Sequence, residues 1–248
     1  MSYHKVFSKI HKWVGLLIAI QLLLWTAGGF VMSYFDINEV RGDHKINPIA
    51  ASAIVAGDFD AAIMGKLIEN NGQAIRTVSA THLYGRPVYR IDYTGGKSVL
   101  FDSKTGERLS PLSEEAITGI AKKLYRGDAP LLQSARLAKT GIEYRGPLPV
   151  WKIDFDDSDQ TSLYFSPDTG QLLAKRTRLW RVYDFMWMLH IMDYDTRDDF
   201  NHPLLYVFAL TAVLFVLSGF ALIYYRFGRR DFKWLGIGKK RRASHKST

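Results

Sequence analysis

Two uncharged apolar stretches lie near the opposite ends of this chain, at residues 13–34 and 203–225. A helix needs about 20 apolar residues to cross the hydrocarbon core of a bilayer, and each stretch is long enough. The first stretch is longer than the apolar part of a signal peptide and lacks a small-residue cleavage pattern, so we expect it to remain as an anchor. The sequence therefore predicts two transmembrane helices that present residues 35–202 as a domain on one side of a bilayer.

Basic residues predict the orientation of the chain in the membrane. Lys5, Lys9 and Lys12 precede the first stretch without any acid, and residues 226–248 contain nine Lys and Arg residues against Asp231 alone. Because basic flanks stay in the cytoplasm, both termini are predicted to be cytoplasmic. The formal net charge of +9 therefore reports membrane orientation. We interpret the basic tail as a contact for the headgroups of the lipid bilayer, and we predict no binding to nucleic acid.

Composition and missing motifs exclude several classes of chemistry. The chain contains no cysteine, which rules out thiolate nucleophiles, cysteine-bound zinc, iron–sulfur clusters and covalently attached haem. Neither an HExxH nor a GxSxG motif occurs. The acids within 193–199 lack the glycine and the terminal glutamate of an EF-hand loop. Residues 95–98 read Gly-Gly-Lys-Ser, but they join two predicted strands and so form a hairpin turn. No catalytic residue and no metal ligand is predicted.

The central segment contains an internal repeat. Its first copy has apolar stretches at 88–93 and 98–101, followed by the turn Asp102–Gly106. The second copy has the matching stretches 150–155 and 162–165 and the turn Ser166–Gly170. The offset between the copies is 62 residues at the start and 64 at the end, because the turn inside the second copy is longer. Two copies of one supersecondary unit are predicted.

Each copy is predicted to be a helix followed by three or four antiparallel strands. Apolar and polar residues alternate within the apolar stretches, which are rich in Val, Ile, Tyr and Phe. Helices are predicted at 59–70 and 113–125, with Ser113 as the N-cap of the second. The expected fold class is therefore α+β, with two small units packed together.

Four further features identify a family resemblance. They are His11–Gly15 at the start of the first apolar stretch, the paired Thr-Gly turns, Leu189–His190 before the second stretch, and Leu217–Phe220 with Tyr225–Arg226 at its end. Together they resemble the PepSY-associated transmembrane family. The resemblance implies two transmembrane helices flanking two tandem PepSY-like helix-plus-antiparallel-sheet repeats. The implied segments are a cytoplasmic N-terminus at 1–12, transmembrane helix 1 at 13–34, periplasmic repeat 1 at 35–112, periplasmic repeat 2 at 113–178, an interfacial aromatic segment at 179–202, transmembrane helix 2 at 203–225 and a basic cytoplasmic tail at 226–248.

The resemblance also implies a bacterial inner-membrane location with a periplasmic central domain. Isolated PepSY domains are regarded as binding or inhibitory modules, whereas larger multi-span relatives include haem-containing reductases of ferric siderophores. The main hypothesis is a non-enzymatic binding or accessory subunit in iron or envelope redox physiology, whose ligand would contact the exposed strands and residues 180–190. The alternative is a b-haem electron-transfer component of a ferric-siderophore reductase. A third hypothesis is a peptidase-inhibitory module. If the chain takes part in an enzyme, we expect a haem-dependent ferric reductase.

His11 and His190 are the candidate haem ligands. His11 is predicted at the cytoplasmic mouth of the first span and His190 on the outer side, so a hydrocarbon core of about 30 Å separates them. One chain cannot hold one haem between them. A parallel homodimer would place each histidine opposite its symmetry mate, and two bis-imidazole b haems would form an electron path across the bilayer. The alternative roles are an interfacial anchor for His11 and structural aromatic packing for His190.

Small residues in the spans allow close approach between helices. Gly28 and Gly29 lie in the outer half of the first span, and Gly219 lies in the inner half of the second. These glycines cannot all meet within one antiparallel helix pair. The sequence therefore leaves open a homodimer or a larger membrane complex.

Overall fold

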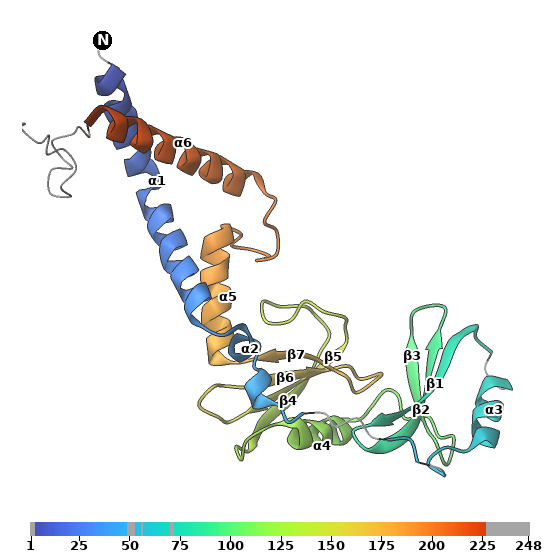
Figure 1. Ribbon diagram of the computed structural model, residues 1–248. Helices are drawn as coiled ribbons and strands as arrows, with labels where there is room; N and C mark the ends of the chain where they lie inside the picture. Colours follow the sequence, from blue (N-terminus) through green and yellow to red (C-terminus); the bar gives the residue numbers. More distant parts are fainter. Residues whose placement is uncertain (1–2, 49–52, 56, 70–71, 227–248) are drawn as a thin grey trace, which may run out of the picture. The chain divides into compact units, whose positions relative to one another are not determined.

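The computed structural model describes residues 3–226 apart from 49–52, 56 and 70–71, so the predicted basic tail lies outside the described residues from 227 onward (Figure 1). The chain divides into two compact units. A helical unit contains residues 1–32 and 186–248, and an α+β unit contains residues 33–185.

Two long helices dominate the helical unit: α1 (Tyr3–Tyr34) and α6 (Pro203–Arg226). Both are long and apolar enough to cross a membrane. Their apolar side chains are mostly exposed, for example Leu17 at 74% and Leu210 at 62%, whereas the core helix of a soluble protein buries such side chains. The length, composition and exposure of both helices therefore fit a lipid bilayer.

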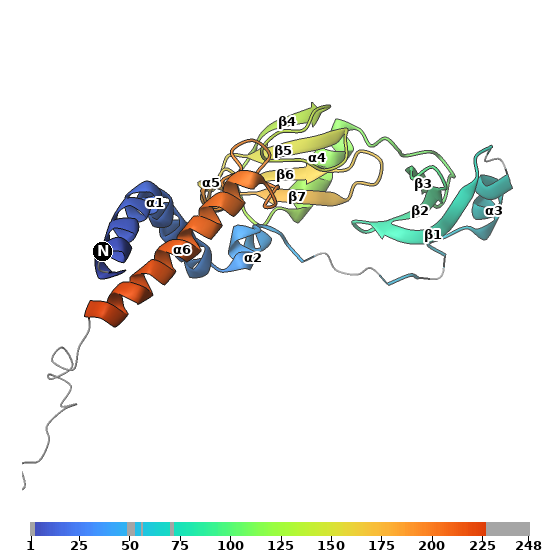
Figure 2. The same cartoon turned by 90° about the horizontal axis from the view of Figure 1, so that it is seen from above.

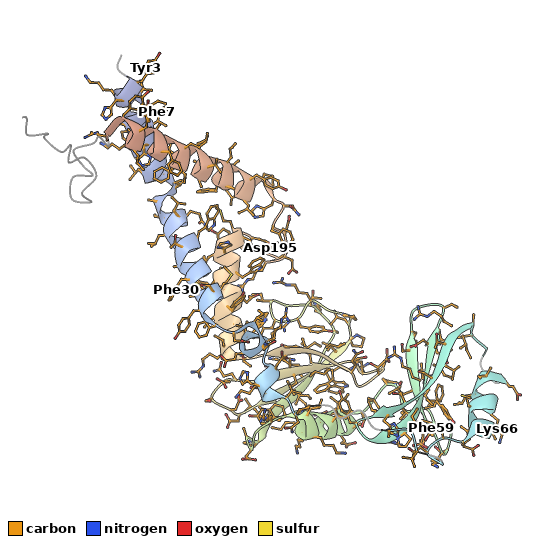
Figure 3. The ribbon with its side chains drawn as sticks, viewed as in Figure 1. Tyr3, Phe7, Phe30, Phe59, Lys66 and Asp195 are labelled. Carbon is orange, nitrogen blue, oxygen red and sulfur yellow. The ribbon has the colours of Figure 1, made fainter. Side chains whose placement is uncertain are left out.

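The first turns of α1 lie beside the end of α6. The ring of Phe7 stacks on that of Tyr225 with centroids 6.2 Å apart, and Nε of Arg226 donates to Nε2 of His4 at 2.8 Å. Figures 1 and 2 show the two helices close together at this end, and Figure 3 shows the labelled Phe7 there. Residues 3–12, which the apolar pattern leaves outside the first span, are thus the first three turns of one continuous helix.

A further helix occupies much of the predicted interfacial segment. α5 (Arg178–Ile191) carries the aromatic residues of that segment. Near its end, the carbonyl oxygen of Leu189 accepts a hydrogen bond of 3.0 Å from Nε2 of Gln21 in α1. Because Gln21 is the strongly polar residue of the first apolar stretch and is only 8% exposed, this bond satisfies a polar group that lipid would leave without a partner.

The first antiparallel sheet follows α3 (Ala61–Glu69). Its three strands are, in spatial order, β1 (Ile75–Leu83), β2 (Arg86–Tyr93) and β3 (Ser98–Asp102). Gly96, with φ at 81°, lies in the predicted hairpin turn between β2 and β3. After this sheet's Thr-Gly turn the chain forms only an isolated bridge, between Phe101 and Arg108, among the described residues.

The second antiparallel sheet follows α4 (Glu114–Leu124). Its four strands are, in spatial order, β4 (Leu131–Leu137), β5 (Val150–Phe155), β6 (Ser162–Phe165) and β7 (Leu172–Arg176). Ser113 caps α4 as predicted, because its Oγ accepts a hydrogen bond from the backbone N–H of Ala116 at 3.3 Å. The α+β class is confirmed, with two small antiparallel sheets, each preceded by a helix.

The two Thr-Gly turns have the same hydrogen bonds. The N–H of Gly106 donates to the carbonyl oxygen of Asp102 at 3.0 Å, and the N–H of Gly170 donates to that of Ser166 at 2.8 Å. Both glycines have positive φ, 71° and 65°, which glycine adopts without steric cost. The predicted duplication is therefore visible in the backbone of both turns.

A polar triad on the sheet face away from the preceding helix is duplicated as well. Its members are Arg90, Asp92 and Ser98 in the first sheet and Lys152, Asp154 and Ser162 in the second. The serine hydroxyl donates to the aspartate at 2.5 Å in the first triad and at 2.6 Å in the second. The cation lies 2.8 Å from the aspartate in the first triad and 3.2 Å in the second. The match between the copies therefore extends to side-chain contacts.

The segment before the first sheet contacts the end of α4, the helix that packs on the second sheet. It contains α2 (Ile37–Val40) and the short 3₁₀ helix η1 (Asp43–Lys45). Ile46 forms a bridge with Tyr125, and the N–H of Asn47 donates to the carbonyl oxygen of Leu124 at 2.7 Å. The predicted first repeat, 35–112, therefore includes residues that belong structurally with the second sheet.

Candidate functional site

An open groove of about 870 Å³ lies between α3 and one face of the first sheet. Tyr93, Val99 and Phe101 form its floor, and Ile63 and Leu67 of α3 form one wall. Alternation along the strands places Tyr93, Val99 and Phe101 on the same face. The volume is within the range of small-molecule sites, about 300 to 1,000 Å³.

The equivalent face of the second sheet is closed by its helix. α4 contributes four buried residues to the core at helical spacing: Ile117, Ile120, Ala121 and Leu124. They pack on the strand residues Ile153, Phe155, Leu163 and Phe165, which are 0–2% exposed. α3 contributes no fully buried residue, and its Ile68 is 46% exposed. The groove exists because the apolar residues of α3 are only partly buried against the first sheet, whereas those of α4 close the core on the second sheet.

Three cations line the groove, and no carboxylate does: Lys66 on α3, Lys97 in the β2–β3 turn and Arg108 after β3 (Lys66 is labelled in Figure 3). None of the three has an ion-pair partner within the part of the chain that the structure describes. Arg108 is held by a hydrogen bond of 2.9 Å from its Nε to the carbonyl oxygen of Ser110. The rim is therefore positively charged above an apolar floor.

The register of the repeat shows that two of these cations are particular to the first copy. The two copies are aligned by matching Ser98 with Ser162 and Gly106 with Gly170. In this alignment Thr161 is the equivalent of Lys97, and Leu172 is the equivalent of Arg108. Thr161 is fully buried, and Leu172 packs on the core of the second unit. Where the second copy closes its core with leucine, the first copy has an arginine at the groove.

A smaller pocket of about 340 Å³ on the second sheet differs in its electrostatics. Two of its three cations are paired: Lys152 lies 3.2 Å from Asp154, and Arg181 lies 2.6 Å from Glu143. Burial alone would raise the pKa of Glu143, but hydrogen bonds from Arg181 and Tyr164 outweigh burial and lower it. The charges of this pocket are used within the fold, so the groove of the first sheet is the better ligand site.

His11 lies between α1 and α6 in the helical unit. Its Nδ1 is 2.8 Å from Oγ of Ser218, and its ring stacks on Phe215 with centroids 4.2 Å apart. A Cβ built on Gly219 would lie 3.2 Å from Cε1 of His11, so this glycine makes room for the ring. His11 thus contacts the neighbouring helix, which differs from the predicted anchor in the headgroups. Its Nε2 makes no hydrogen bond to any described residue.

His190 lies near the end of α5, beside the second half of α1. Its ring is 6.0 Å from that of Trp25, and Gly28 faces its Cβ at 3.9 Å. Nδ1 of His190 and Nε1 of Trp25 are both buried, and neither finds a hydrogen-bond partner among the described residues. His190 is therefore packed with aromatic neighbours and has one unsatisfied ring nitrogen.

The two candidate haem ligands lie far apart in one chain. His11 and Gly28, which contacts His190, are separated by about 25 Å along α1 at 1.5 Å per residue. The glycines meet different helices, since Gly28 faces α5 and Gly219 faces α1. No single group can bridge His11 and His190 in one chain, as predicted. Their role as ligands stays a prediction.

The acidic loop after α5 is organised by one of its own carboxylates. Asp193 accepts hydrogen bonds from the backbone N–H groups of Asp195, Thr196, Asp198 and Asp199. Within the described ranges, no group of three or more His, Cys, Asp or Glu side chains is arranged to hold a metal ion.

The three groove cations were not predicted as site residues. The sequence signal that points to them is the register of the repeat, in which Arg108 replaces an apolar residue that closes the other copy. Comparisons with family models, with curated proteins and with solved structures found no match to this chain.

Proposed function

We propose that the chain is a bacterial inner-membrane protein whose α+β unit lies in the periplasm and acts as a binding or accessory subunit. The observation that carries the proposal is the groove of the first sheet, which combines the volume of a small-molecule site with an apolar floor and unpaired cations. The resemblance to the PepSY-associated transmembrane family supports iron or envelope redox physiology as the setting.

The acidic loop supports a particular placement in the membrane. Asp193 and its acidic neighbours follow directly after Leu189, which is bonded to Gln21 in the middle of α1. Because carboxylates are costly inside hydrocarbon, this loop belongs at the outer membrane surface. The same cost keeps Lys5, Lys9 and Lys12 out of the hydrocarbon, so the span of α1 begins after Lys12.

Thiol labelling tests this placement, because the chain has no cysteine of its own. Leu17→Cys should resist a membrane-impermeant maleimide applied to vesicles from the outer side. Asp195→Cys, at an exposed position of the acidic loop, should react. Protection of Asp195→Cys together with Leu17→Cys would contradict the placement of this loop outside the hydrocarbon.

Ligand binding to the groove is tested with a fluorophore on Gln73→Cys, at the groove edge, in the full-length protein in lipid nanodiscs. Naphthalene compounds should change the fluorescence in a saturable way. Thr105→Trp, which fills the rim, should abolish the change, whereas the matched variant Thr140→Trp, at an exposed position outside the groove, should preserve it. No saturable change with any compound, or an equal loss in both variants, would refute a binding role for the groove.

A b-haem electron-transfer component is the second candidate function. Haem supplies one-electron transfer when bound. Metal-ligating histidines usually have their second ring nitrogen hydrogen-bonded, and the Nδ1 contact of His11 with Ser218 leaves Nε2 available in that way. His190 has an unsatisfied buried Nδ1. Each histidine would act with its symmetry mate in a parallel homodimer.

The absorption spectrum of the detergent-purified protein tests the haem hypothesis. A Soret band with reduced α and β bands, weakened in both His11→Ala and His190→Ala, would support it. Cross-linking through Lys12→Cys, next to His11, would report the homodimer. Colourless protein from haem-replete cells would remove this candidate and leave the groove proposal unaffected.

A further inference from the structure

We infer that the groove of the first sheet binds a small amphipathic organic anion, a molecule with an apolar body and a carboxylate or similar group. This inference rests on the proposed binding function and specifies the chemical class of its ligand. It follows from the charge of the rim, the nature of the floor and the comparison between the two copies.

The rim of the groove is positively charged, and no carboxylate in the groove lining neutralises it. Lys66, Lys97 and Arg108 come from three different segments and converge on one groove, and the groove lining contains no Asp or Glu. Like charges brought together raise the free energy of the empty protein, and an anion relieves that repulsion. The second unit shows the contrasting case, in which Lys152 and Arg181 are both paired within the fold.

The floor requires an apolar body on the ligand. Tyr93, Val99 and Phe101 are contributed by the same sheet face. Tyr93 and Val99 are only 7% and 2% exposed, so the partly buried ring of Phe101 is the surface on which a flat apolar group can stack. Free inorganic phosphate would leave this floor in contact with water. The pairing of floor and rim therefore favours an amphipathic anion over a simple ion.

The copy comparison argues against a purely structural role for the cations. In the second unit the position of Arg108 is occupied by Leu172, which packs on the closed core. A leucine at 108 would likewise cover the apolar floor. The exposed arginine keeps the groove open and adds charge, which are the two properties that this class of ligand uses.

The test compares three probes with one naphthalene body and different charges: 2-naphthoate, 2-naphthalenemethanol and 2-naphthylmethylammonium. With the fluorophore on Gln73→Cys of the full-length protein in zwitterionic nanodiscs, naphthoate should bind about tenfold more tightly than the alcohol, and the ammonium most weakly. Raising the salt concentration should weaken only the anion. Octanoate against octanol tests whether an aliphatic body serves as well as an aromatic one.

Substitutions locate the effect in the groove. Lys66→Gln, Lys97→Gln and Arg108→Gln should each weaken naphthoate by about two- to fivefold, with no change for the alcohol. Lys104→Gln is the matched control, because Lys104 is exposed near the same turn and does not line the groove. Arg108→Leu, which introduces the residue of the second copy and would cover the floor, should weaken both naphthoate and the alcohol without unfolding the sheet.

The outcomes separate this inference from the function on which it rests. Equal binding of all three probes, or an equal effect of Lys104→Gln, would overturn the anion inference while leaving the groove as a binding site. Absence of saturable binding by any probe would overturn both.

Discussion

The duplicated sheets contain two equivalent phenylalanines whose truncation should have different costs. Phe165 is 0% exposed in the closed core of the second unit, whereas Phe101 is only partly buried and lines the groove. Phe165→Ala removes a fully buried ring and leaves a cavity, at a cost of about 3–5 kcal/mol. Phe101→Ala removes a ring with one side already open, so only the covered part of its area is lost, about 1–2 kcal/mol. We therefore expect a difference of about 2 kcal/mol.

Amide hydrogen exchange measured by mass spectrometry on the full chain reports each sheet separately. Phe165→Ala should lower the opening free energy of peptides from β5 and β6, and Phe101→Ala should lower that of peptides from β2 and β3 by the smaller amount. Leu132→Ala, at a side chain that is 62% exposed, is the control and should change neither. Equal losses for the two phenylalanines would show that α3 closes over Phe101 in solution, and the groove argument would fail.

Three further predictions concern pH, the second turn and the helix pair. A hydrogen bond from Arg86 is the main cause that lowers the pKa of Asp102 to about 2. The ionised Asp102 therefore stabilises the fold at pH values above the ordinary carboxyl pKa near 4, and this stabilisation is lost as the pH falls through about 2. Since Arg86 is largely exposed, Asp102→Asn should cost about 1 kcal/mol at pH 7 and almost nothing at pH 2 in urea unfolding; a cost that does not change with pH would contradict this. Gly170→Ala combines a positive φ with contacts of 2.8–2.9 Å to two leucine side chains, so it should cost about 2–4 kcal/mol in the same assay, and a neutral effect would refute the close packing of this turn. Gly219→Ala should displace His11 and alter the imidazole nitrogen shifts in NMR spectra, and an unchanged spectrum would show that the ring is not packed against that glycine.

Local patterns in the sequence predicted the duplicated elements well. Positive-φ glycines after threonine and the alternation of apolar residues depend on neighbours a few residues away, so the strands at 150–155 and 162–165 have the predicted bounds. The N-cap role of Ser113 is equally local and is confirmed. The second apolar stretch, 203–225, is helical throughout, and α6 begins at its predicted first residue, Pro203.

Features that depend on contacts between distant segments were not predictable in this way. The contact between the first described turns of α1 and the end of α6 is one that hydropathy alone does not report. Residues 37–47 precede the first sheet in the chain but make backbone bonds to the end of α4, beside Tyr125. The groove arises because the apolar residues of α3 are only partly buried, and the extent of their burial leaves a weak signal in a single sequence.

The contrast between Leu172 and Arg108 connects stability with function in this fold. Burying a leucine side chain stabilises a small core by about 1.5–3 kcal/mol, so a copy with arginine at that position gives up a contribution that its sister retains. Natural proteins depart from consistent packing mainly at functional sites. The second copy has a closed core and the added contacts of segment 37–47, so it keeps the packing that the first copy gives up. The first unit can therefore keep an open, charged groove, and the cost of that groove is itself an argument that the groove binds something.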